Sequence, residues 1–185
     1  MLKRYLAKLV EFSRTKTPPV YRAASMMFGA ALFLFVIPGT LLFFGKFVAG
    51  HVSMVCPREA RLASALTVGA LGLCLLAWAV LAQWRTGEGT PAPIAPTRRL
   101  VITGPYRLCR NPIELGAVLY YYGLGALAHS VTAGLFMFLC AFLVGTCYHK
   151  FVEERELFLR FGEEYLEYKR RTPFLIPRLW RRTPG

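Results

Sequence analysis

The sequence predicts an all-α integral membrane protein with about four transmembrane helices, and three observations support this fold class. Hydrophobic residues make up 55% of the chain and the mean hydropathy is +0.42, more than a soluble domain of this size normally has. Uncharged stretches run over residues 23–45, 62–84 and 115–149. The basic residues gather between these stretches, on one side of a four-span bundle.

Residues 20–84 hold the first two spans. Each uncharged stretch here is 23 residues long, and about 20 predominantly apolar residues suffice to cross a bilayer. The first span contains Ile37-Pro38-Gly39, which predicts a kink of the kind that membrane helices tolerate when neighbours satisfy the freed backbone groups. Because a basic, Pro-containing segment of 22 residues precedes this stretch, we expect a membrane anchor and no cleaved signal peptide.

Residues 112–152 are predicted to form a helical hairpin. The third uncharged stretch has 35 residues, counting His as neutral, which is too long for one span and slightly short for two. Ala128-His129-Ser130 interrupts it and predicts a tight turn. A first arm that starts at Pro112 has roughly 17 residues and a length of about 26 Å, which just crosses the hydrocarbon.

The two ends of the chain are predicted to be helical at the membrane surface. Residues 1–19 form an amphipathic interfacial helix, with an apolar face that Thr17-Pro18-Pro19 ends. Residues 153–185 form a cytoplasmic C-terminal helix and tail. An apolar and aromatic stripe at helical spacing follows one face of it, most simply for packing: Leu157, Phe161, Tyr165 and Tyr168.

Residues 85–111 are expected to be a cytoplasmic loop that binds a cofactor. The loop has 27 residues rich in Gly, Pro and Arg, and structureless loops of that length are usually functional or disordered. We treat residues 1–185 as a single domain.

The net charge of +13 is explained by membrane topology. Of the 23 Lys and Arg, six lie in residues 1–22, five in 85–112 and nine in 150–185, against three between the first two spans. This positive-inside bias places both termini in the cytoplasm, and in a bacterium the membrane would be the inner one. The same charge attracts anionic membrane lipids, so we expect no nucleic-acid partner.

No metal site is expected. The five Cys form no CxxC pair, the three His have no metal-ligand spacing, and there is no Asp. An odd, scattered set of cysteines also argues against a disulfide framework.

Two motifs carry a family resemblance. GPYRLCRNP, residues 104–112, leads into an apolar helix, and EERELFLRFGEEYLEYKRRTPFLIP follows at residues 153–177. This pair resembles the isoprenylcysteine carboxyl methyltransferase and phospholipid methyltransferase families, and GEGTPAP at residues 87–93 is similar to a microbial branch of that group. The resemblance covers about half of the chain.

The resemblance implies a helical membrane protein whose cytoplasmic end encloses S-adenosyl-L-methionine, with the substrate entering from the lipid. The family's cofactor contacts carry over onto ten residues here: Arg98, Arg99, Leu100, Val101, Tyr106, Asn111, Pro112, Ile113, Glu114 and Glu153. On chemical grounds Arg110, with Arg98, Arg99 and Arg107, suits the cofactor carboxylate. Glu153 or Glu154 suits its amino group or ribose hydroxyls. Tyr106 offers an aromatic face.

The sequence departs from the better-known members at two positions. Their His-Pro-x-Tyr is Asn111-Pro112-Ile113-Glu114 here, so that Glu114 replaces a Tyr. The eukaryotic enzymes have an Arg one helical turn before the conserved Glu, where this chain has His149, which argues against a prenylcysteine substrate. We assign His149 and Arg171 to substrate binding.

Structural interpretations stay open beside these assignments. Asn111, Pro112 and Glu114 also match the N-cap, N1 and N3 positions of a helix, close to a capping box. The loop arginines also serve as topology signals, Glu153 and Glu154 also suit a solvated helix face, and His149 also suits a purely interfacial position.

The function predicted from these features is methyl transfer from S-adenosylmethionine to a lipid-like or membrane-partitioning acceptor, through a carboxylate, thiol or amine. The sequence identifies no catalytic base. We therefore expect that the acceptor is already deprotonated or is deprotonated by water. Two alternatives remain: an inactive membrane scaffold that keeps the fold, and a metal-dependent hydrolase using His149, Glu153 and Glu156.

Overall fold

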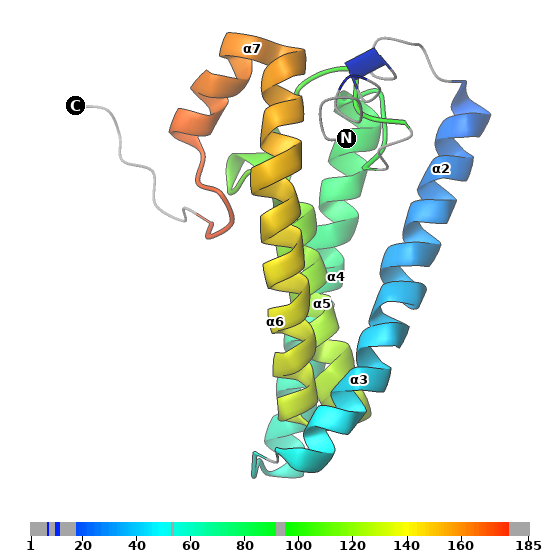
Figure 1. The fold of residues 1–185 in the computed structure, drawn as a ribbon, viewed down its shortest axis with the longest axis vertical. Coiled ribbons are helices and arrows are strands. Elements are labelled where there is room, and N and C mark those ends of the chain that lie inside the picture. The colour runs from blue at the N-terminus through cyan, green and yellow to red at the C-terminus, as the bar shows by residue number, and fades with distance from the viewer. Residues whose placement is uncertain (1–6, 8–9, 12–17, 53, 92–94, 178–185) are drawn as a thin grey trace.

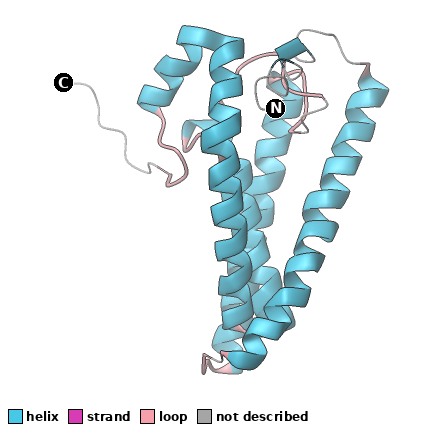
Figure 2. Ribbon diagram, viewed as in Figure 1, coloured by secondary structure: helices cyan, strands magenta, loops and turns pink. Residues whose placement is uncertain are grey.

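The computed structural model describes residues 7, 10–11, 18–52, 54–91 and 95–177, and it is helical with no strand in these ranges (Figures 1 and 2). The predicted interfacial helix over residues 1–19 lies largely outside them. The elements in order are α2 (Pro19–Ala31), the π-helical turn η1 (Leu32–Val36), α3 (Ile37–His51), α4 (Arg58–Thr86), the 3₁₀ turn η2 (Gly104–Arg107), α5 (Pro112–Ala128), α6 (Val131–Tyr148), the π-helical turn η3 (His149–Glu153) and α7 (Glu154–Arg171).

The predicted membrane fold is confirmed. Among the described residues, three helical segments are long and apolar enough to cross a membrane: Pro19–His51, Arg58–Thr86 and Val131–Arg171. The fourth, α5, has 17 residues and packs between α4 and α6 (Figure 1). The predicted hairpin is present, with Ser130 accepting a hydrogen bond from the Ala133 N–H at the start of α6. The five-segment division of the chain stays a prediction.

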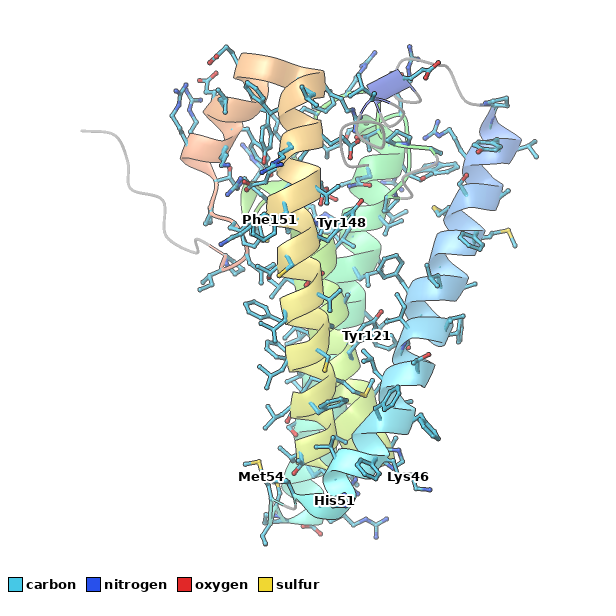
Figure 3. All side chains as sticks on the ribbon, in the orientation of Figure 1. Lys46, His51, Met54, Tyr121, Tyr148 and Phe151 are labelled. Carbon is cyan, nitrogen blue, oxygen red and sulfur yellow. The ribbon has the colours of Figure 1, made fainter. Side chains whose placement is uncertain are left out.

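The bundle has two ends, which we name by the connections that they carry. The loop end carries residues 87–91 and 95–111 together with η3 and α7. The turn end carries residues 52, 54–57 and 129–130, and Figure 3 shows Lys46, His51 and Met54 there. Arg22 ties α2 to the loop end, because its guanidinium donates to the Trp84 carbonyl at 3.0 Å and lies over the Trp84 ring.

Glycines allow α4 and α5 to lie in close contact. A Cβ added to Gly123 of α5 would lie 2.5 Å from the Gly69 Cα of α4, and one on Gly116 would lie 2.8 Å from the Gly72 carbonyl oxygen. Small residues that let backbones approach in this way are the usual packing device of membrane helices. The contact fixes the two helices that residues 87–111 connect.

A π-helical turn directly precedes Pro38 in the first span, and α5 supplies a hydrogen bond that the proline cannot. The kink predicted at Pro38 stays a prediction. In the π-helical turn each N–H bonds the carbonyl five residues back, as Ile37 does to Leu32. Pro38 has no N–H, so the Phe33 carbonyl loses its partner in this pattern. The Tyr121 hydroxyl donates to that carbonyl at 2.7 Å (Tyr121 is labelled in Figure 3).

The C-terminal helix is broken, and the prediction of one straight stripe along it was wrong. Gly162 has φ 52° and ψ −125° inside α7, and the chain turns back there toward the bundle (Figure 1). A Cβ at Gly162 would meet no atom within 4 Å, so the glycine serves the backbone conformation and not the space. The turn separates Leu157 and Phe161 from Tyr165 and Tyr168, which return toward the loop.

Candidate functional site

Residues 87–91 and 95–99 lie against each other at the end of α4. The Gly87 carbonyl accepts bonds from the Arg98 and Arg99 N–H groups at 2.6 and 3.2 Å. A Cβ on Gly89 would lie 2.4 Å from the Thr97 Cα, so only glycine fits there. Glu88 lies between the two glycines with φ 56°. The segment is therefore a closed loop and not an open chain.

A buried pair on α7 attaches this loop to the C-terminal helix. Arg160 and Glu156 join at 2.6 Å, with side chains only 5% and 9% exposed. Arg160 also donates to the Thr97 carbonyl. Because Glu156 is held in this pair, the trio His149, Glu153 and Glu156 proposed for a metal hydrolase is not assembled.

Tyr106 lies in a buried cluster with Ala79 and Val101, against which Ile113 and Tyr168 pack. Its hydroxyl accepts a 2.7 Å bond from Gln83 Nε2, and its carbonyl accepts one from the Tyr168 hydroxyl at 2.7 Å. Burial raises the pKa of Tyr106 far above its ordinary value, against the Gln83 bond that lowers it. The phenol therefore stays protonated and acts as a wall and a hydrogen-bonding group.

Arg110 is the centre of a second cluster. Its Nη1 donates to Glu154 Oε1 at 2.6 Å and to the Tyr165 hydroxyl at 3.2 Å. Lys169 approaches the other Glu154 oxygen at 2.5 Å. The Arg110 side chain is 11% exposed, so this charge is largely removed from water and balanced locally.

Asn111 does not cap α5 with its side chain, although it stands at the N-cap position. Its Nδ2 and its backbone N–H both donate to the Phe174 carbonyl, at 3.0 and 3.2 Å. Because that N–H is taken by Phe174, Glu114 does not complete a capping box. The chain after α7 therefore lies against the start of α5.

Glu114 faces α6. Its carboxylate lies directly against Gly145, where a Cβ would be 2.0 Å from Oε1. His149 Nε2 is 3.6 Å from Glu114 Oε2, and His149 Nδ1 is hydrogen-bonded to Glu153 Oε2. Glu114, His149 and Glu153 therefore meet at one place. Glu114 and His149 are the two departures from the family pattern, and Glu153 begins the second motif.

The remaining predicted residues lie further out. Arg98 and Arg99 pair with Glu88 at 3.5 and 2.9 Å, and the Arg99 side chain is 72% exposed. Leu100 is half-buried and Pro112 is buried as the first residue of α5. Arg171 pairs with Glu167 and is 77% exposed, so it is not brought to the other predicted residues.

Sequence reasoning missed Gln83, Gly145 and Phe174. Gln83 could have been found, because it is a polar residue within an uncharged span, one turn before the loop. Gly145 carries no signal of its own within an apolar helix. Phe174 acts through its backbone carbonyl, which no side-chain pattern reveals.

The loop end fits S-adenosylmethionine in the chemistry of its donors and acceptors. Seven buried side-chain atoms have no hydrogen-bond partner within the described part of the chain, and three of them are Gln83 Oε1, Arg110 Nε and Glu114 Oε1. Buried polar atoms normally have partners. Gln83 contacts Tyr106 through its other amide atom. Acceptors and a guanidinium N–H of this kind suit the amino, hydroxyl and carboxylate groups of an amino acid cofactor with an adenosine moiety.

A comparison with protein families identifies the chain. The model of the family described as phospholipid methyltransferase matches residues 60–164, more than half of the sequence and from α4 to the second half of α7. The chain belongs to the phospholipid methyltransferase family. Membership supports methyltransferase activity and implies a methyl donor.

Individual relatives fall into two groups by name. Methanethiol S-methyltransferase 2 of Bradyrhizobium diazoefficiens is 36% identical over 77 residues, 42% of this chain and 28% of that protein. Nickel-cobalt-cadmium resistance protein NccN of Alcaligenes xylosoxydans xylosoxydans is 32% identical over 121 residues, 63% of this chain and 52% of that protein. Cobalt-zinc-cadmium resistance protein CzcN of Cupriavidus metallidurans is 37% identical over 81 residues, 43% and 36%.

The chain thus spans about half or less of the length of these relatives. No solved structure matches it. Within the described residues, no three His, Cys or Glu side chains converge as a metal site.

Proposed function

We propose that this protein transfers a methyl group from S-adenosyl-L-methionine to a lipid-like or membrane-partitioning acceptor at the loop end of the bundle. The observation that carries the proposal is that the family's two motifs meet there around buried polar atoms without partners, Gln83 Oε1, Arg110 Nε and Glu114 Oε1. The alternative, an inactive scaffold, has no need of such atoms. Some relatives are named as resistance proteins, which leaves the scaffold alternative open.

The proposal includes an orientation. The loop end faces the cytoplasm of a bacterial inner membrane, where a soluble cofactor and a membrane-dissolved acceptor can meet, and both termini lie on that side. The basic residues near this end support the assignment. Membrane lipids surround the spans, whose exposed side chains include Phe35, Phe43 and Leu143.

The cofactor supplies a methyl group on a sulfonium, which is transferred in a displacement that removes the positive charge from sulfur. The chain's own part is to bind and orient the cofactor and the acceptor and to exclude water from them. Such positioning is worth up to roughly 7–11 kcal/mol in well-aligned reactions. Gln83 Oε1 and the Glu153 carboxylate are suited to N–H or hydroxyl donors, and Arg110 Nε to a carboxylate. Tyr106 and Val101 form the apolar wall.

Binding of the cofactor tests the proposal. We would titrate S-adenosylmethionine and its demethylated product into full-length protein in detergent, by calorimetry. The variants are Gln83→Ala and Glu153→Ala, with Glu163→Ala as the control because Glu163 is exposed on α7. We expect binding by wild type and control, weakened in both site variants.

A folded, monodisperse wild type that binds neither molecule would reject the enzyme and leave the scaffold. Equal binding by all four proteins would reject the residues assigned here.

A further inference from the structure

Glu114 is a buried carboxylate without a neutralising cation. Its side chain is 10% exposed and Oε1 has no hydrogen-bond partner in the described part of the chain. Among the described residues, its one ion-pairing neighbour is His149, at 3.6 Å. An ionisable group near hydrocarbon is expensive, and such groups are functional more often than structural.

Two contacts of His149 connect Glu114 to Glu153. Nδ1 is hydrogen-bonded to the Glu153 carboxylate, so in the neutral imidazole Nδ1 carries the proton and Nε2 keeps a lone pair. That lone pair faces Glu114 Oε2 at 3.6 Å. The imidazole is therefore placed to accept a proton from Glu114 at one nitrogen and to release one toward Glu153 at the other.

The three side chains lead from the interior to the surface. Glu114 is 10% exposed, His149 17% and Glu153 30%. Tyr121, the other ionisable group within electrostatic reach of Glu114, donates its hydroxyl to Phe33. Lys150, next to His149, lies over the Phe174 ring. Thr146, one turn before His149 on α6, has a buried Oγ1 without a partner.

We propose that Glu114, His149 and Glu153 form a proton relay that deprotonates a thiol acceptor. The inference rests on the proposed function and names its acceptor class. The thiol sulfur forms a bond to the donor's methyl carbon and displaces the donor's sulfur, which keeps the electron pair of the broken bond. The thiol proton passes to the Glu114 carboxylate and from there to His149 Nε2, while the Nδ1 proton leaves through Glu153 to water.

A thiol fits this relay better than the other acceptors. A carboxylate acceptor is already ionised and is repelled by Glu114. An ammonium has a pKa near that of Lys, about 10.4, and would bind Glu114 as a salt bridge without giving up its proton. A thiol, with a pKa of about 8.5, is mostly protonated at neutral pH and gains from a base.

The first test measures the proton and not the turnover. Octanethiol is titrated into full-length protein in lipid nanodiscs without cofactor, and the ultraviolet absorbance of the thiolate is followed. The proteins are wild type, Glu114→Gln, His149→Gln, the double variant and the control Glu163→Gln. We expect a thiolate signal in wild type and control that is lost in the three relay variants.

The second test is the pH profile of methyl transfer to octanethiol and to octanoate. At neutral pH we expect Glu114→Gln to be on the order of 10²–10⁴-fold slower with the thiol, the usual contribution of general base catalysis. Its rate should rise tenfold per pH unit until the thiol ionises unaided. The double variant should be no slower than either single variant, because the residues act in series. A structural role would not give this pH recovery.

Cofactor binding separates the two proposals. If wild type fails to bind S-adenosylmethionine, the proposed function falls and the relay with it. If wild type binds it but all variants give the same thiolate signal and pH profile, only the relay is overturned. Preferred methylation of octanoate or of octylamine would likewise overturn the thiol assignment.

Discussion

Removing the Tyr121 hydroxyl should destabilise the protein only because Pro38 is present. The hydroxyl donates at 2.7 Å to the Phe33 carbonyl, whose partner in the π-helical turn would be the N–H that Pro38 lacks. Tyr121→Phe leaves that carbonyl unsatisfied in the membrane. A buried polar group without a partner costs about 1–3 kcal/mol, and side-chain hydrogen bonds in membrane proteins average about 0.6 and reach about 1.7 kcal/mol. We therefore expect a loss of about 1–2 kcal/mol.

Pro38→Ala supplies the missing N–H and should make the Tyr121 hydroxyl dispensable. The free energy of unfolding is measured in bicelles for wild type, both single variants and the double variant, and we expect a coupling of about 1 kcal/mol. Tyr122→Phe is the control, because its hydroxyl lies 3.3 Å from Ser64 Oγ and not against the first span. If Tyr121→Phe lowers the free energy of unfolding equally with and without Pro38, the Tyr121 hydroxyl does not replace the N–H that Pro38 lacks.

Two further predictions concern packing and burial. Gly123→Ala should lower the free energy of unfolding by about 1–3 kcal/mol, because its Cβ would lie 2.5 Å from Gly69 Cα. The control Gly29→Ala, with no atom within 4 Å of its Cβ, should leave the free energy of unfolding unchanged. Equal effects of the two substitutions would contradict the close contact. Burial raises the pKa of Cys109 to about 11, so its thiol is protonated at pH 8. A variant that keeps only Cys109 should therefore react with maleimide only after unfolding, whereas one that keeps only Cys56, half-exposed at the turn end, should react when folded. Rapid labelling of Cys109 in the folded protein would contradict its burial.

The bundle could be predicted from the sequence because its signals are local in the chain. Charge-free length predicts the spans, and Ala128-His129-Ser130 predicts the hairpin turn. The partner of the Phe33 carbonyl could not be predicted, since it depends on which residue of α5 lies opposite Phe33. Gly162 was read as part of a helix because a lone glycine within a helical pattern is tolerated. Its positive φ appears only in the folded chain.

The motifs nominate residues for the candidate site but do not predict their contacts. Asn111, Pro112 and Glu114 match a helix start, and Pro112 does begin α5. The local rule for their side chains failed because a backbone carbonyl sixty-three positions along the chain takes the Asn111 donors. His149 and Glu153 are four residues apart, so their meeting on one helical face is a local effect. Their meeting with Glu114 is tertiary and requires the missing side chain of Gly145.

The distribution of charge at the loop end argues for a function of Glu114. Arg110 is balanced by Glu154, Arg160 by Glu156, and Arg98 and Arg99 by Glu88. These four arginines thus have direct ion-pair partners, some of them well buried, whereas Glu114 has an imidazole at 3.6 Å and an oxygen without a partner among the described residues. A scaffold would be more stable with an uncharged residue at this position, because a buried charge without a good partner costs several kcal/mol. A carboxylate that the fold tolerates at such a cost is best explained by what it does to a bound molecule.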